Sequence, residues 1–149
     1  MSEILSEGKL LLTEYKGSVS NIPEKFKRAE EKGKIIYLSL NGKHVPKTNS
    51  DIVLSEVPEF HTQKGIEILP HLLFEIIRDT IASHEHNNIS GIIIEIDEIF
   101  EKFRDKSKIS DFLSALKSVL HISNITVVML TKSPDDLLKK YGLNKNLFD

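Results

Sequence analysis

One hydrophobic stretch constrains the fold more than any other part of the chain. Gly91 opens a run of isoleucines that ends at Asp97 and Glu98 and then passes into Phe100. An almost unbroken run of β-branched residues is typical of a strand that is covered on both faces. The sequence therefore predicts a central strand over 91–97 with acidic side chains at its carboxyl end.

This acidic exit has two interpretations. Open α/β sheets bind their ligands outside the carboxyl ends of the strands, so Asp97, with Glu98 behind it, is a candidate for holding a magnesium ion through water. The plainer interpretation is that both acids favour the positive end of a following helix. The pattern alone favours the plainer interpretation, because hydrophobic strands that end in Asp-Glu are common.

The other apolar segments alternate between strand-like and helix-like patterns. Further strands are predicted over 8–13, 34–40, 51–57 and 125–131, and helices over 23–32, 70–86, 108–121 and from Ser133 to Tyr141. This alternation predicts an α/β fold with three layers, in which a mainly parallel sheet has helices on both faces. We expect residues 1–149 to form a single domain, because 149 residues match the usual domain size.

Composition limits the partners that the chain can attract. It has 20 Lys and Arg against 22 Asp and Glu, so a net charge of -2 gives no overall field that attracts nucleic acid or anionic lipid. It has no cysteine, which excludes disulfides and thiolate metal sites. Without a signal-peptide pattern or an apolar run of membrane-spanning length, we expect a soluble, cytoplasmic protein.

Three segments resemble RecA-like ATPases, and the KaiC-like branch in particular. After the strand that follows Gly8, a loop and a helix lead to Gly33-Lys-Ile-Ile-Tyr-Leu-Ser-Leu40, which is similar to the returning strand of that family. The run from Gly91 to Asp97 resembles its Walker B strand, and Ile125 to Pro134 resembles its next strand with a polar exit. The resemblance implies a RecA-like core in which the 125–131 strand lies between the first strand and 91–97.

The Walker B position itself has two candidates, Asp97 and Glu95. A glutamate inside a buried strand is unusual, and the simplest explanation is that Glu95 lies near the sheet edge or pairs with a lysine. The sequence leaves the choice between the two acids open.

The chain departs from the ATPase pattern where phosphate would bind. Residues 14–23 contain one glycine and no Gly-Lys-Ser/Thr, and Pro23 removes an N–H group from the helix end that would hold phosphate. Asn41 stands where the family has its catalytic glutamate, and an amide cannot accept a proton from water. The resemblance therefore implies a fold that has lost ATP hydrolysis, with no catalytic residue, cofactor or metal assigned.

Two functions of different classes remain open. The first is a non-catalytic module that assembles with itself or with RecA-like partners, as Walker-deficient members of the superfamily do in recombination accessory complexes and in Elongator. Its partner-binding residues would be Asn41, Lys43, His44, Lys47 and Lys132. The second is an ATPase that binds ATP with magnesium through Lys16, Gly17, Ser18, Asp97 and Glu98. A third possibility, nucleic-acid binding through residues 41–50, depends on local charge alone, since no aromatic residue stands beside it.

Overall fold

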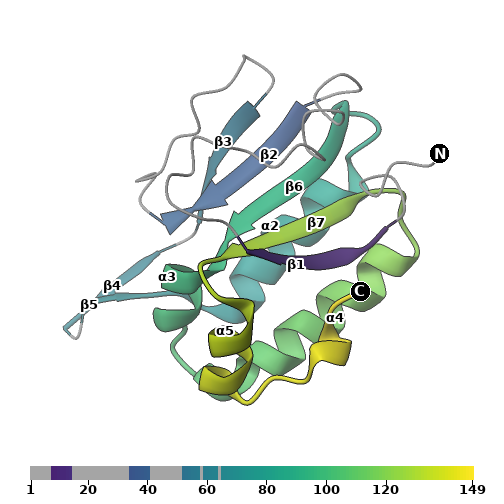
Figure 1. Ribbon diagram of the computed structural model, residues 1–149. Helices are drawn as coiled ribbons and strands as arrows, with labels where there is room; N and C mark the ends of the chain where they lie inside the picture. Colours follow the sequence, from purple (N-terminus) through teal and green to yellow (C-terminus); the bar gives the residue numbers. More distant parts are fainter. Residues whose placement is uncertain (1–7, 15–33, 41–51, 58, 64) are drawn as a thin grey trace.

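A parallel sheet of five strands forms the centre of the computed structural model, which describes residues 8–14, 34–40, 52–57, 59–63 and 65–149. The strand order is β1 (Leu10–Glu14), β7 (Thr126–Thr131), β6 (Ile89–Glu95), β2 (Lys34–Ser39) and β3 (Ile52–Glu56) (Figure 1). Each neighbouring pair is parallel. The predicted α/β class is therefore confirmed, and so is the place of the 125–131 strand between the first strand and the isoleucine-rich strand.

The isoleucine-rich strand β6 occupies the middle of the sheet. Ile93 lies opposite Tyr37 of β2 on one side and Val128 of β7 on the other. Ile92 and Ile93 are both fully buried, and successive strand residues point to opposite faces, so both faces of the strand are covered. The strand ends at Glu95, earlier than predicted, because helix α3 (Ile96–Glu101) begins directly after it.

Helices α2 (Pro70–Ala82) and α4 (Ile109–His121) pack against each other and contribute to the main hydrophobic core. Their apolar faces meet strand residues of one sheet face, among them Ile92, Ile94, Val127 and Met129. Residues of the other face, such as Ile35, Tyr37 and Val128, are also fully buried. The predicted helix over 23–32, on which the prediction of helices on both faces depends, lies outside the described residues.

The predicted end of helix α2 is wrong. It stops at Ala82 and not at His86, and turns follow as far as Asn88, whose φ of 55° is left-handed. Residues 83–88 are all polar, so they contribute no apolar side chain that the core would bury. At the helix end, Nδ1 of His84 lies 2.6 Å from the carbonyl oxygen of Ile81. The physical reason for the early end is therefore the loss of the apolar stripe.

Helix α5 (Pro134–Tyr141) begins and ends at the predicted residues. The hydroxyl of Ser133 accepts a hydrogen bond from the N–H of Asp136 at 3.3 Å, and Gly142 ends the helix with a φ of 61°. These are a standard N-cap and a left-handed C-terminal residue.

A short hairpin was not predicted. Strands β4 (Phe60–Thr62) and β5 (Gly65–Glu67) pair in antiparallel fashion, and Gly65 has a φ of 113° that favours glycine. The hairpin joins the main fold through Ile68, which pairs with Phe103, and through an ion pair of 2.6 Å between Glu67 and Arg104.

Residue 149 closes part of the sheet edge at β1. Its N–H donates to the carbonyl oxygen of Leu10 at 2.7 Å, and its carboxylate accepts from the N–H of Leu10 at 2.8 Å. The same carboxylate lies 3.1 Å from Nε2 of His121 and 3.8 Å from Nζ of Lys117. Partial burial raises the pKa of Asp149, but the hydrogen bond from Leu10 and the two basic side chains outweigh it, so the pKa lies below its ordinary value.

Within the described part of the chain, no helix is long and apolar enough to cross a membrane.

Candidate functional site

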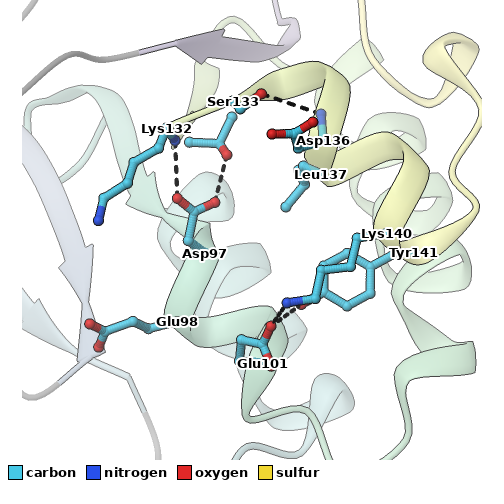
Figure 2. A pocket seen from close by; sticks show the side chains of 10 residues that line it. Asp97, Glu98, Glu101, Lys132, Ser133, Asp136, Leu137, Lys140 and Tyr141 are labelled. Carbon is cyan, nitrogen blue, oxygen red and sulfur yellow. Dashed lines mark hydrogen bonds and ion pairs between the residues drawn. The ribbon is translucent and has the colours of Figure 1, made fainter.

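A pocket of about 320 Å³ lies at the carboxyl ends of β6 and β7 (Figure 2). We call it the carboxyl-end pocket. Three elements build it: the first helix turns after β6, the last residues of β7, and helix α5. Its lining residues are Asp97, Glu98, Glu101, Thr131, Lys132, Ser133, Asp136, Leu137, Lys140 and Tyr141.

Asp97 connects the exits of the two central strands. From the first turn of α3, one carboxylate oxygen accepts from the hydroxyl of Thr131 at 2.5 Å, and the other accepts from the N–H of Lys132 at 3.0 Å. The shorter distance is that of a charge-assisted O–H···O⁻ hydrogen bond, and the longer one is an ordinary N–H···O distance. Asp97 therefore lies at a helix start, as the plainer interpretation predicts, but its carboxylate is directed to β7 and does not cap α3.

The structure brings together only part of the residues that the sequence singled out. Asp97, Glu98 and Lys132 all line the carboxyl-end pocket. Figure 2 shows the Glu98 carboxylate and the Lys132 side chain directed away from the Asp97 carboxylate, and both residues are exposed. The other candidates lie outside the described residues, namely Lys16, Gly17 and Ser18 for the nucleotide and Asn41, Lys43, His44 and Lys47 for a partner.

Sequence reasoning missed a second polar group on the opposite wall of the pocket. One carboxylate oxygen of Glu101 accepts from Nζ of Lys140 and, at 3.2 Å, from the hydroxyl of Tyr141. Nζ of Lys140 also lies 5.5 Å from the centre of the Tyr141 ring, which packs edge-on against Phe100. A signal was present in the spacing, because Glu101 follows Asp97 by four residues and so lies on the same face of α3.

The pKa of the Tyr141 hydroxyl is affected by the charge of Asp97 at the other side of the pocket. Partial burial raises the pKa of its hydroxyl, and the negative charge of Asp97 raises it further. The field of the Asp97 carboxylate therefore extends across the pocket to the aromatic wall.

Glu95 lies at the end of β6, and its position differs from the sheet-edge explanation. It is 7% exposed on the central strand, not at the sheet edge, and its carboxylate accepts from the hydroxyl of Tyr37 at 2.6 Å. One partner of Glu95 is thus a tyrosine of the neighbouring strand. Glu95 also stands outside the lining of the carboxyl-end pocket, which contains Asp97 instead.

Charge in the carboxyl-end pocket is mainly negative. Four carboxylates line it, against the ammonium groups of Lys132 and Lys140. Over the described residues, no group of three or more His, Cys, Asp or Glu side chains is arranged to hold a metal ion.

No protein-family model matches the chain, and a search of curated proteins finds no significant match.

Proposed function

We propose that this protein is a non-catalytic, RecA-like interaction module, a pseudo-ATPase that assembles with itself or with RecA-like partners. One observation carries the proposal. The acid at the carboxyl end of the central strand, Asp97, uses both carboxylate oxygens to bind Thr131 and Lys132. It holds two strand exits together where an ATPase would direct an acid toward a magnesium ion.

The strand order supports the RecA-like part of the proposal. The resemblance implied that the 125–131 strand lies between the first strand and the Walker B-like strand, and β7 does lie between β1 and β6. The segment similar to the family's returning strand forms β2, directly beside β6. A first strand directly beside the 91–97 strand would have removed the basis of the resemblance.

Charge supports the loss of nucleotide binding. A triphosphate in the carboxyl-end pocket would face four carboxylates, and one of the two lysines already pairs with Glu101. Two like charges about 6 Å apart repel by roughly 3 kcal/mol at the effective dielectric constant of a protein surface. Without a glycine-rich loop to offset this repulsion, phosphate has no favourable position there.

The same features suit contact with another protein. The carboxyl-end pocket combines charged groups with the apolar and aromatic side chains of Leu137 and Tyr141, and Lys132 and Glu98 are exposed at it. Polar surfaces of this kind are typical of transient or hetero-oligomeric interfaces more than of permanent, apolar ones.

Calorimetric titration of the purified protein with ATP and magnesium, together with an ATPase assay, tests the proposal. We expect no saturable heat, no turnover above buffer, and association that increases with protein concentration in sedimentation velocity. The variant Asp97→Asn should give the same null result in the ATPase assay, and Asp79→Asn, an exposed acid on α2, is the matched control. Hydrolysis that Asp97→Asn abolishes and Asp79→Asn preserves would overturn the proposal.

A further inference from the structure

We propose that the carboxyl-end pocket receives a basic side chain of the partner protein, an arginine in preference to a lysine. This inference rests on the proposed function as an assembly module and adds the chemistry of what occupies the pocket. Two features carry it: the charge balance, and an aromatic wall that an ammonium group of the chain itself already contacts.

The charge balance leaves the carboxylates in excess. The lining has four carboxylates and two ammonium groups, and the ammonium group of Lys140 pairs with Glu101. The carboxylate of Asp136 has no ion-pair or hydrogen-bond partner among the described residues, and Figure 2 shows it turned toward the side formed by Asp97 and Lys132. A cation placed beside the Asp136 carboxylate would compensate part of this excess.

The wall opposite Asp97 already binds a cation. The ammonium group of Lys140 contacts the Glu101 carboxylate and lies 5.5 Å from the centre of the Tyr141 ring. A carboxylate beside an aromatic face is a favourable environment for a cation, because the ring quadrupole adds to the ionic attraction. Lys140 therefore shows which chemistry the wall accepts, and it is also the internal competitor that an incoming cation would displace.

The dimensions suit one long side chain. At about 320 Å³, the pocket is at the lower end of the range for ligand sites. Leu137 gives the stem of such a side chain an apolar contact, as long basic side chains require. A planar guanidinium group can bind a carboxylate through two parallel hydrogen bonds and can stack on an aromatic ring, whereas an ammonium group acts as a point charge, so arginine is preferred.

A short peptide provides the test. The probe is acetyl-Gly-Arg-Gly-amide, and its control carries neutral citrulline in place of arginine. We expect the arginine peptide to shift the backbone amide signals of residues 97–101 and 131–141 in NMR spectra, with saturation at millimolar concentration. The citrulline peptide should leave them unchanged.

Three variants of helix α5 test whether the arginine peptide binds in the carboxyl-end pocket. Asp136→Asn should weaken binding about fivefold, because it removes one carboxylate charge from the pocket. Asp135→Asn, the adjacent exposed acid that does not line the pocket, should change it less than twofold. Lys140→Gln should tighten binding about fivefold, because the internal competitor is gone. The contrast between Asp136→Asn and Asp135→Asn distinguishes occupation of this site from general attraction to an acidic surface, because only Asp136 lines the pocket.

Each outcome separates the two proposals. Shifts that spread over the whole surface, or equal effects of Asp135→Asn and Asp136→Asn, would overturn the arginine site and leave the interaction module untouched. Saturable binding of ATP with magnesium at the same residues would overturn the proposed function itself.

Discussion

The link between Asp97 and the end of β7 should make a measurable contribution to stability. Two hydrogen bonds of 2.5 and 3.0 Å join the carboxylate to the hydroxyl of Thr131 and the N–H of Lys132. Thr131 is 1% exposed, so its hydroxyl would remain buried without a partner if the carboxylate were removed. Hydrogen bonds to charged groups contribute about 1.5–3 kcal/mol each, and the partial exposure of Asp97 places these at the lower end.

Three variants turn these bonds into free energies of unfolding. Asp97→Ala loses both bonds and should destabilise the protein by about 2–4 kcal/mol, whereas Asp97→Asn keeps one acceptor and should cost about 1–2 kcal/mol. Thr131→Val removes the hydroxyl at nearly constant volume and should also cost about 1–2 kcal/mol. In the double variant Asp97→Ala with Thr131→Val, the two costs should not add, because the shared bond is counted once.

Urea unfolding followed by circular dichroism is the appropriate assay, since the chain has no tryptophan. Asp135→Asn serves as the control, because this exposed acid lies on α5 outside the pocket lining and should change stability by less than about 0.5 kcal/mol. If the costs of Asp97→Ala and Thr131→Val add fully in the double variant, Asp97 does not link the two strand exits through Thr131.

Three further predictions concern pH and association. The pKa of Asp149 is lowered below 3.8 on folding, so the stability that its carboxylate contributes is present above that pH and disappears as the pH falls through the folded pKa. The difference in unfolding free energy between the wild type and Asp149→Asn should therefore shrink in acid. A difference that stays constant with pH would contradict this. Burial, and to a smaller extent the charge of Asp97, raise the pKa of Tyr141 above 10.0, so its protonated hydroxyl stabilises the folded state less as the pH rises beyond its ordinary pKa. In ultraviolet titrations, Asp97→Asn should lower the pKa of Tyr141. An unchanged pKa would argue against an electrostatic effect of Asp97 on Tyr141. Reversing the charges of Lys43 and Lys47 to glutamate should weaken association in sedimentation while leaving the melting temperature nearly unchanged; unaltered association would exclude these lysines from the interface.

Local signals made most of the fold predictable. The isoleucine run, the apolar stripe of α4 and the Ser133 cap of α5 are each local signals, and all three elements form within about two residues of the predicted bounds. The hairpin at β4 and β5 was missed because its strands are three residues long and largely polar, so no periodicity could reveal them.

The candidate site was harder to predict because it depends on contacts between distant segments. The Glu95 carboxylate pairs with Tyr37, which is 58 positions away, and Glu101 meets Lys140 across 39 positions. A single sequence gives the residue types but not the packing of α3 against α5 that brings them together. The acidic exit at Asp97 was recognisable, while its binding to Thr131 required the neighbouring strand to be known.

The contact of residue 149 with Leu10 has a practical consequence for protein engineering. Because Asp149 is hydrogen-bonded to Leu10 through its N–H and its side chain, a tag fused directly after residue 149 would begin beside the first strand and could disturb these bonds. An insertion after Gln63 in the hairpin turn should instead retain the order of the sheet strands. Affinity tags or fluorophores placed at the hairpin would therefore leave the contact between Asp149 and β1 intact.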